Sequence, residues 1–245
     1  MKKILWYHIF MRLDKFFSES SVLSRSECKK AVKKGEITVN GETVKNADLK
    51  IDENKDEIAY KGEKITYSRY TYIMLNKPSG VVSATEDGRD KTVIDLLPEN
   101  YRNRGLFPCG RLDKDTLGLI ILTNDGISAH NALSPKKHFE KTYYFKTADG
   151  FSDGDAKKIE GGLLLADGYT TKPCRIERIS DREGNIILTE GKYHEIKRLF
   201  AAVGNKIVYL ERIKFGDIAL GDLPRGDWRT LSDEETAAFI DKNRR

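Results

Sequence analysis

The chain has 245 residues, of which 39% are apolar and 33% charged, and its formal net charge is +5. This composition is typical of a globular protein and excludes a disordered chain or one embedded in a membrane. The length suffices to bury a core without disulfides or metal. Residues 1–50 contain 11 Lys and Arg against 6 Asp and Glu, whereas residues 51–245 contain 32 of each. The basic first part predicts contact with a polyanion, and a solvated charged surface is the simpler alternative.

The first ten residues are similar to the start of a signal peptide. A positive beginning precedes the apolar run 4–10, but this run is short, includes His8 and is followed by no small-residue cleavage site. No stretch approaches the roughly 18 apolar residues that cross a bilayer. We therefore expect a cytoplasmic protein with no membrane partner. Residues 1–10 are either an upstream start before Met11 or a short extra strand.

The cysteine and histidine residues give no metal-binding pattern. Cys28, Cys109 and Cys174 are far apart, odd in number and in no CxxC pair, so neither a disulfide framework nor a zinc site is expected. His130 and His138 lack the spacing and the carboxylate partners of a metal site. The sequence predicts no metal and a reducing compartment.

Residues 11–35 predict two helices. Leu13, Phe16 and Phe17 have the spacing of a short amphipathic helix. Residues 27–34 predict a second helix, which ends at Gly35 because a left-handed residue closes a helix at little energetic cost. The candidates for its N-cap are Ser24 and Ser26.

The period then changes to two, which predicts a β-hairpin. Ile37, Val39 and Val44 alternate around the dipeptide Asn40-Gly41, which a type I′ turn prefers because both central residues need positive φ. Two helices and a hairpin in about 40 residues form a module too small to be a catalytic domain.

The second helix places positive charge on neighbouring turns, where it could neutralise several phosphates or simply be solvated. Residues 12–16, 24–26 and 35–42 resemble an S4 domain, an RNA-binding module with this helix pair and hairpin. The basic face and the resemblance together give a set of expected RNA-binding residues: Arg12, Lys15, Arg25, Lys29, Lys30, Lys33, Lys34 and Asn40.

Residues 52–69 predict a last strand and a linker, and the rest of the chain predicts a larger α+β domain with a largely antiparallel sheet. We expect an S4-like domain at 11–62 and a second domain at 66–240. The expected strands of the second domain include 73–75, 117–122, 143–145, 186–188 and 207–210, and the expected helices are 126–133, 153–160 and 193–203.

Residues 109–126 form the segment richest in chemistry, and they read CGRLDKDTLGLIILTNDG. A Gly-Arg-Leu-Asp turn leads into an apolar strand, and a rigid strand can hold a carboxylate such as Asp113 in place for catalysis. A lone aspartate in this position more often caps a turn or pairs with a neighbour such as Arg111.

This segment resembles the signature of the pseudouridine synthases of the ribosomal small-subunit type and their large-subunit relatives. Residues 74–80, 140–143, 190–205 and 223–231 support the resemblance, which covers residues 11–235. It implies that a uracil ring is cut from C1′ at N1, turned, and rejoined through C5. Asp113 matches the catalytic aspartate, which either attacks C1′ or removes the C2′ proton. The reaction needs no cofactor.

The resemblance also implies roles for four other residues. Arg111, with Leu112 beside it, matches the position that fills the space left by the extruded uridine. Tyr143 matches a tyrosine whose ring can stack on uracil. Lys197 matches a basic residue that favours the carboxylate form of its aspartate, and Arg198 competes for that role. Glu195 departs from the commoner glutamine.

Three alternatives remain beside a synthase acting on 16S rRNA. One is a synthase acting on 23S rRNA, the second is a non-catalytic ribosome assembly factor, and the third is an N-glycosidic hydrolase that uses Asp113 and Asp115 as a carboxylate pair. The run 200–205 favours the small-subunit branch. We expect a monomer whose partner is 16S rRNA or an assembly intermediate of the small ribosomal subunit.

Overall fold

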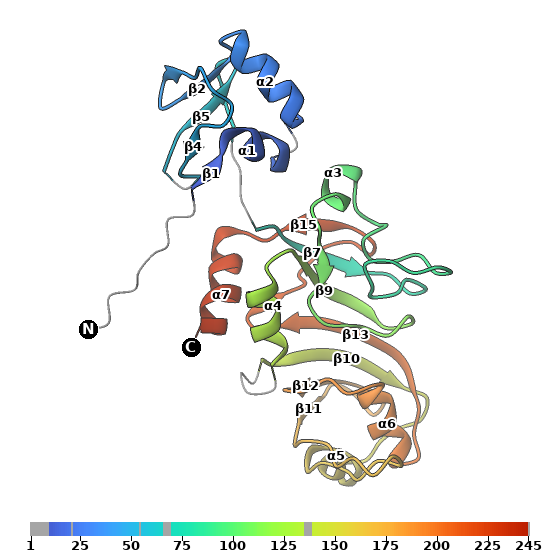
Figure 1. Ribbon diagram of the computed structural model, residues 1–245. Coiled ribbons are helices and arrows are strands. Elements are labelled where there is room, and N and C mark those ends of the chain that lie inside the picture. The colour runs from blue at the N-terminus through green and yellow to red at the C-terminus, as the bar shows by residue number, and fades with distance from the viewer. Residues whose placement is uncertain (1–9, 21, 54, 66–69, 135–138, 245) are drawn as a thin grey trace, which may run out of the picture. The chain divides into compact units, whose positions relative to one another are not determined.

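The computed structural model describes residues 10–20, 22–53, 55–65, 70–134 and 139–244. The chain divides into two compact units, at Met1–Tyr70 and Thr71–Arg245, and each is considered by itself (Figure 1). Residues 1–9, for which a strand or an upstream start was considered, lie outside the described residues, as do residues 66–69 of the expected linker.

The small unit contains the two expected helices, α1 (Leu13–Glu19) and α2 (Arg25–Lys33). The Ser24 hydroxyl accepts a hydrogen bond from the Glu27 backbone N–H, and the Glu27 carboxylate accepts one from the Ser24 backbone N–H. This reciprocal capping box identifies Ser24 as the N-cap. Gly35 takes the left-handed conformation just after the helix, with φ of 71°.

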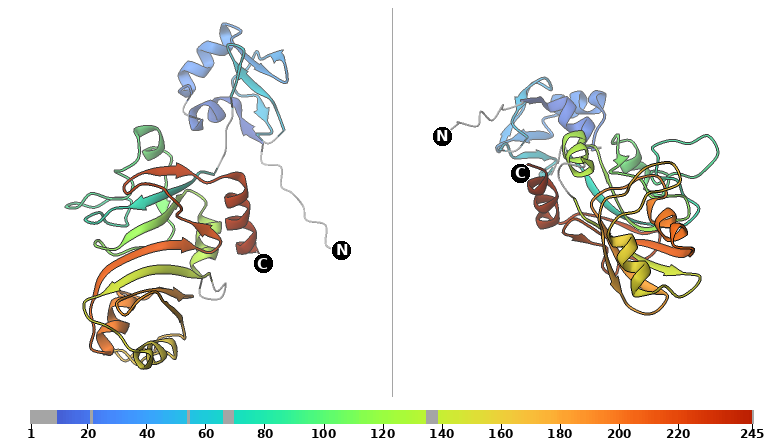
Figure 2. Two further views of the ribbon diagram at one scale, coloured as in Figure 1. Left: turned by 180° about the vertical axis from the view of Figure 1, so that it is seen from behind. Right: turned by 90° about the horizontal axis from the view of Figure 1, so that it is seen from below.

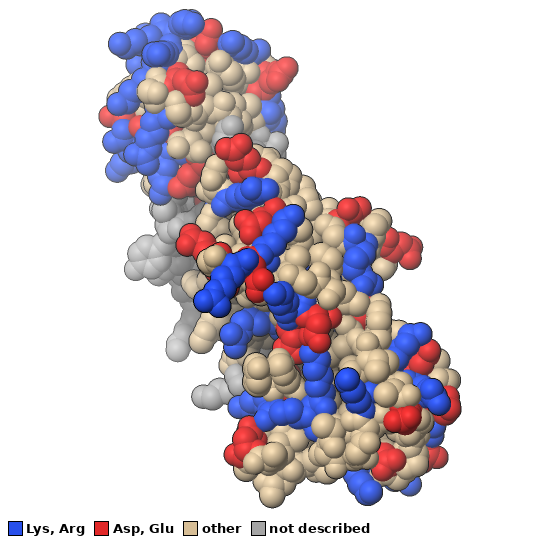
Figure 3. Space-filling model, turned by 90° about the vertical axis from the view of Figure 1, so that its right-hand side faces the viewer, with Lys and Arg blue, Asp and Glu red and all other residues tan. Residues whose placement is uncertain are grey.

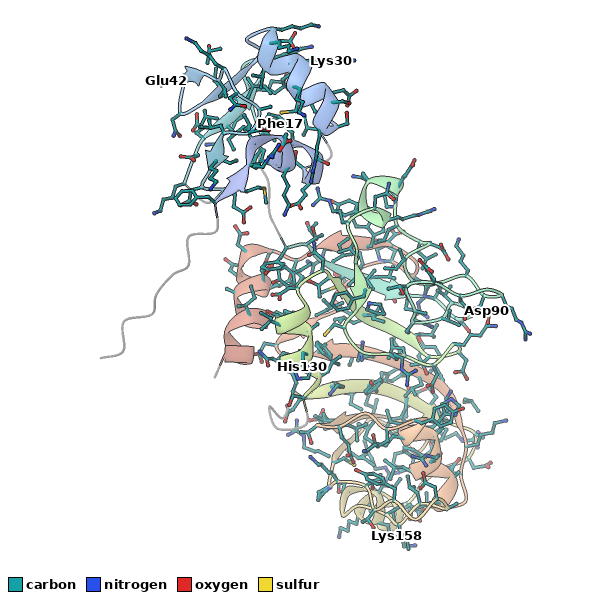
Figure 4. All side chains as sticks on the ribbon, in the orientation of Figure 1. Phe17, Lys30, Glu42, Asp90, His130 and Lys158 are labelled. Carbon is teal, nitrogen blue, oxygen red and sulfur yellow. The ribbon has the colours of Figure 1, made fainter. Side chains whose placement is uncertain are left out.

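The strands of the small unit form two sheets: β1 (Met11–Arg12) pairs with β4 (Lys50–Ile51), and β3 (Glu42–Thr43), β2 (Ile37–Val39), β5 (Ile58–Tyr60) and β6 (Glu63–Lys64) follow one another in a second sheet. Asn40 and Gly41 both have positive φ, as the expected hairpin turn requires. The apolar side of both helices packs on these strands, so Phe17 is buried while Lys30 extends outward (Figure 4).

The sequence led us to expect one last strand after residue 51, and the structure contains two. β5 and β6 form a second hairpin around Lys61 and Gly62, which both have positive φ. The expected domain end at residue 62 falls inside this hairpin, and β6 belongs to the small unit.

The large unit is built on a nine-stranded sheet, with the main order β11-β12-β10-β13-β9-β7-β15. Among the described strands the β9–β13 pairing is parallel and the others are antiparallel, so the α+β prediction is confirmed. The strands are β7 (Tyr72–Lys77), β8 (Phe107–Pro108), β9 (Leu117–Thr123), β10 (Lys141–Thr147), β11 (Arg175–Arg178), β12 (Glu183–Leu188), β13 (Ile207–Phe215), β14 (Ile218–Ala219) and β15 (Trp228–Thr230).

Helices cover both faces of the large sheet. α4 (Gly126–Leu133) and α7 (Asp233–Arg244) pack on one face, and α5 (Asp153–Glu160) and α6 (Glu195–Ala202) on the other (Figure 2). The short helix α3 (Glu99–Arg102) lies in a connection. In β7, Ile73 and Leu75 join the core under α5 and α6, whereas Tyr72 and Met74 join the core under α4 and α7. Residues 72–75 of this strand are therefore all apolar or aromatic, because both of its faces are buried.

None of the helices in the described parts of the chain is long and apolar enough to cross a membrane.

Candidate active site

Asp113 lies in the loop that leads into β9, and buried hydrogen bonds hold this loop on both sides. The Ser83 hydroxyl accepts from the Leu112 backbone N–H at 3.0 Å and donates to the Leu112 carbonyl at 2.8 Å. The fully buried Lys77 ammonium donates to the carbonyls of Lys114 and Thr116 at 3.1 and 2.8 Å. The backbone around the carboxylate is thus fixed before any substrate arrives.

Lys77 is buried in β7, and its charge is part of the site. Burial lowers the pKa of Lys77 to about 8, and the negative charges of Asp115 and Asp113 oppose that shift. The ammonium contributes positive charge beneath the loop, in addition to its three hydrogen bonds to carbonyls.

Lys197, on α6, places its ammonium between two carboxylates. Its Nζ lies 3.1 Å from Asp113 Oδ2 and 2.6 Å from Asp115 Oδ1. Burial lowers the pKa of Lys197, but the hydrogen bonds to Asp115 and Asp113 outweigh this effect and leave the pKa raised. Burial likewise raises the pKa of Asp115, and the bond to Lys197 makes the net shift downward. Lys197 and Asp115 are therefore both charged at neutral pH.

His194 approaches Asp113 from the other side, with Nε2 3.6 Å from Asp113 Oδ1. Its backbone is in the left-handed region, with φ of 49°, directly before α6. The ring of Tyr193 stacks on the His194 ring at 3.8 Å, and Tyr193 is 73% exposed. This exposed aromatic pair forms part of the rim beside the carboxylate.

A pocket opens at Asp113, and the residues expected in catalysis meet there. Its lining includes Arg111, Leu112, Asp113, Tyr143 and Lys197. Tyr143 comes from β10 and is buried, so its ring forms a wall of the pocket. Asp113 retains partial exposure, and Arg111 is exposed at the opening.

The arrangement suits chemistry on a sugar that carries a flat base. The lining contains the Asp113 carboxylate, with the Lys197 ammonium beside it, and the buried Glu195 carboxylate. Leu112, Ile196 and Leu210 provide apolar walls around Tyr143. Such a pocket can hold an extruded nucleotide with its base against an aromatic ring. In the described residues no group of three or more His, Cys, Asp or Glu could hold a metal ion.

Comparison with known proteins decides the family. The model of the RNA pseudouridylate synthase family matches residues 71–202, and that of the S4 domain matches residues 11–57. The chain belongs to the RNA pseudouridylate synthase family. It is a pseudouridine synthase with an S4 domain at its N-terminal side, as its sequence motifs predict.

Relatives match the synthase over nearly all of its length. An RNA pseudouridine synthase of Bacillus subtilis is 44% identical, covering 92% of this chain and 96% of the relative. Ribosomal small subunit pseudouridine synthase A of Pasteurella multocida is 43% identical, covering 94% and 99%. A crystal structure described as a pseudouridylate synthase has 38% identity and a TM-score of 0.67, covering 94% of this chain and all of that one.

The structure separates the two candidates for the basic partner of Asp113. Lys197 contacts Asp113, whereas Arg198 bonds Asp167 at 2.6 Å. Residues 195–202 are helical, as expected for 193–203. Consecutive helical residues point about 100° apart, which is why the two cations of the synthase diverge.

The RNA-binding residues expected in the small unit fall into two groups. Arg12 bonds Asp14 and Asp48, Lys15 lies 3.5 Å from Glu19, and Asn40 bonds Asp56 and the Glu57 backbone. These three residues are engaged within the unit. The other members are all exposed on α2 and its end: Arg25, Lys29, Lys30, Lys33 and Lys34. Figure 3 shows Lys and Arg gathered along the edge of this unit.

Sequence reasoning missed several residues that shape the site of the synthase. Lys77 lies at the end of a largely apolar strand. The feature of the sequence that could have indicated its role is its position in the motif 74–80. His194 was assigned no role, although it lies in the motif 190–205 that carries Lys197. Lys141 and Arg212 are buried beside Tyr143, and Lys141 lies in the supporting motif 140–143 without having been assigned a role.

Proposed function

We propose that this synthase converts one uridine of 16S rRNA to pseudouridine, with Asp113 as the catalytic carboxylate. The observation that carries the proposal is the contact of the Asp113 carboxylate with Lys197, inside a pocket walled by Tyr143. Arg111, which is exposed on the same loop, would enter the space that the extruded uridine leaves. Leu112 was expected to share this role, but it is buried and would instead form a wall of the pocket.

The reaction follows from this geometry. The uridine leaves its stack at a cost of about a few kcal/mol, and its base lies against Tyr143. Asp113, beside Lys197, either attacks C1′ or removes the C2′ proton, and the N1–C1′ bond breaks. The uracil turns within the pocket and C5 bonds to C1′, as the bond from Asp113 to C1′ breaks or the proton returns to C2′. The C5 proton then departs and N1 takes up a proton. Atoms and electrons balance without oxidant, reductant or metal.

The target is inferred from relatives. Proteins named ribosomal small subunit pseudouridine synthase A are 43% identical in Pasteurella multocida and 38% identical in Escherichia coli, over 94% of this chain in both cases. Residues 200–205 favour the same branch. The substrate is then 16S rRNA or an assembly intermediate of the small ribosomal subunit in the cytoplasm. The chain has one synthase unit with one pocket at Asp113, and we propose that it acts as a monomer.

The rival hydrolase mechanism needs Asp113 and Asp115 to act as an acid and a base. Asp115 is 69% exposed at its side chain, it bonds Lys197, and it is outside the pocket lining. Its charge therefore serves to position Lys197, and the second carboxylate in the pocket lining is the buried Glu195 rather than Asp115.

The decisive experiment maps pseudouridine in rRNA by carbodiimide-block reverse transcription. A deletion strain should lose one 16S site, which the wild-type gene restores and Asp113→Asn does not. As the matched control, Asp115→Asn should keep turnover within about tenfold of the wild type, and Asp113→Asn should keep RNA affinity within a few-fold.

Each rival has its own outcome in the same experiment. Loss of a 23S site with 16S unchanged would reassign the target. Release of free uracil would support the hydrolase, full turnover by Asp113→Asn would remove Asp113 from catalysis, and unchanged rRNA in the deletion strain would support an assembly factor.

A further inference from the structure

Two buried cations beside Tyr143 form no ion pair within the described residues, and the charges of Glu195 and Glu190 offset only part of the effect of burial on Lys141. Arg212 is 1% exposed and Lys141 is 7% exposed. The Lys141 ammonium donates to the Phe139 carbonyl at 3.1 Å, and Arg212 Nε donates to the Leu119 carbonyl at 2.7 Å. Arg212 Nη2 is buried and makes no hydrogen bond within the described chain. Because an uncompensated buried charge is strongly destabilising, this arrangement requires an explanation.

Strand register places both cations next to the pocket. Arg212 on β13 is the cross-strand partner of Tyr143 on β10, and Lys141 lies two residues before Tyr143 on the same face of β10. The Arg212 guanidinium lies 5.9 Å from the centre of the Tyr143 ring. The aromatic wall of the catalytic pocket and the two cations are thus side by side on one sheet face.

Lys141 and Arg212 line a cavity of about 260 Å³ that continues from the catalytic pocket. Arg111, Tyr143 and Lys192 line both spaces, and Lys172 adds a further positive charge to the cavity.

The carboxylate in this lining is Glu190, and it is already engaged. The Tyr169 hydroxyl donates to one of its oxygens at 2.6 Å, and the Lys172 backbone N–H donates to the other at 2.7 Å. The lining therefore carries a surplus of positive charge, and part of that charge is buried.

We propose that this cavity is a phosphate subsite, which takes a phosphodiester group flanking the extruded uridine. The inference rests on the proposed function, because it assigns the group to the same RNA. A phosphodiester carries the missing negative charge and offers acceptor oxygens to the open Arg212 Nη2 and to the Lys141 ammonium. Extrusion rotates the backbone on either side of the nucleotide, so a flanking phosphate accompanies the base.

The subsite couples recognition to catalysis. Binding the phosphate beside Tyr143 fixes the sugar between that phosphate and Asp113, which holds C1′ near the carboxylate. Burial, with the nearby charge of Arg212, lowers the pKa of Lys141 to about 8, as expected for an ammonium that lacks an anion until substrate binds.

The direct test uses the wild-type synthase and RNA with neutral methylphosphonates. A methylphosphonate replaces the phosphate on the 5′ side or the 3′ side of the target uridine, and pseudouridine formation is measured at varied RNA concentration. We expect one of the two replacements to lower kcat/KM at least tenfold, while a methylphosphonate four nucleotides away has little effect. Equal activity of all the RNAs would overturn the proposal.

The variants locate the effect. In Lys141→Met the methylphosphonate should lower kcat/KM by only about twofold, because the cation that attracts the phosphate is gone. In Arg212→Lys the decrease in kcat/KM should be intermediate, because a positive charge remains at that position. The matched control is Lys146→Met, on the same strand, whose ammonium bonds Glu183 at 2.8 Å. If the methylphosphonate lowers kcat/KM of folded Lys141→Met as much as that of the wild type, the assignment to Lys141 is overturned. If this variant does not fold, the wild-type measurement alone decides the proposal.

Inorganic phosphate distinguishes the source of the anion. Phosphate should raise the Tm of the wild type more than that of Lys141→Met, and it should compete with RNA. Phosphate binding without any methylphosphonate effect would mean a site for free phosphate and overturn the RNA assignment. If the wild type forms no pseudouridine in any rRNA, the proposed function fails. Separately, if phosphate raises the Tm of the wild type and of Lys141→Met equally, the phosphate subsite is overturned.

Discussion

The Lys197 ammonium lies between two acidic side chains beside the pocket. Lys197 contacts Asp113 and Asp115, so removal of either carboxylate leaves the lysine with one partner. A cation between two neighbouring carboxylates offsets the repulsion between them. It also gives them different tasks, since one faces the pocket and the other holds the lysine.

Lys141 should destabilise the free protein at neutral pH. Its pKa is lowered to about 8 in the fold, against about 10.4 in an unfolded chain. Between these values the unfolded state binds more protons, so this residue's contribution to stability rises with pH. We expect Lys141→Met to be more stable than the wild type at pH 7 by about 1–2 kcal/mol, after allowance for the lost bond to Phe139.

That advantage should disappear by about pH 10, where Lys141 is neutral in the fold. Urea unfolding at both pH values measures it, and Lys157→Met, at an exposed lysine of α5, is the control. A pH-independent difference between Lys141→Met and the wild type would contradict the argument.

Local motifs determined how well individual residues could be predicted. Asp113, Tyr143 and Lys197 could be proposed because each stands in a short, ordered motif, and the structure brings all three to one pocket. Lys77, Lys141 and Arg212 could not, because their importance comes from burial and from cross-strand register. A lysine that is buried in a strand looks like a solvated one until its neighbours are known.

At the scale of elements, β9 joins the catalytic loop to the centre of the sheet. Gly118 in this strand has φ of 96°, and a Cβ there would lie 2.3 Å from the Arg212 carbonyl oxygen and 2.8 Å from the Arg212 nitrogen. Both atoms are backbone, so the close approach of β9 and β13 depends on glycine.

Gly118→Ala should therefore destabilise the large unit by about 2–4 kcal/mol through strain and overpacking. Thermal or urea unfolding measures this change. The control is Gly88→Ala, where a Cβ meets no atom within 4 Å and the change should stay within about 0.5 kcal/mol. Equal stability of the two variants would show that the strands can separate without loss.

Elements with strong local signals were predicted well. The helices expected at 126–133 and 153–160 have those bounds in the structure, and the apolar runs became β7, β9, β10, β12 and β13. β11 and α7 were missed. β11 is largely exposed and has little apolar pattern, so pairing with β12 determines it. α7 follows a capping box of Ser232 and Glu235, a signal the sequence does contain.

At the scale of the whole molecule, charge and chemistry occupy different units. The exposed cations of α2 belong to the small unit, and the catalytic pocket belongs to the large one. Their sequence neighbours Arg12, Lys15 and Asn40 are held by contacts within the small unit. We therefore expect α2 to provide most of the contacts between the small unit and RNA phosphates.

Replacing the four α2 lysines by alanine should flatten the salt dependence of RNA affinity. Four lost phosphate contacts reduce the slope of log Kd against log salt by about three. Titration of labelled rRNA at several salt concentrations measures it. The changed residues are Lys29, Lys30, Lys33 and Lys34.

The control changes the same number of exposed lysines in the large unit, and we expect a smaller change in slope from it. If the slope of log Kd against log salt is the same for the two variants, the α2 lysines are solvated and do not contact RNA phosphates. The control residues are Lys157, Lys158, Lys206 and Lys214.

The pairing of β15 with β7 sets an order of assembly during synthesis. β7 begins the large sheet at Tyr72, and one of its two neighbours, β15, is at Trp228–Thr230. The strands of the small unit find all their partners by Lys64. A growing chain on the ribosome therefore completes its small unit long before the large sheet can close. The nascent protein can hold RNA before it can modify it.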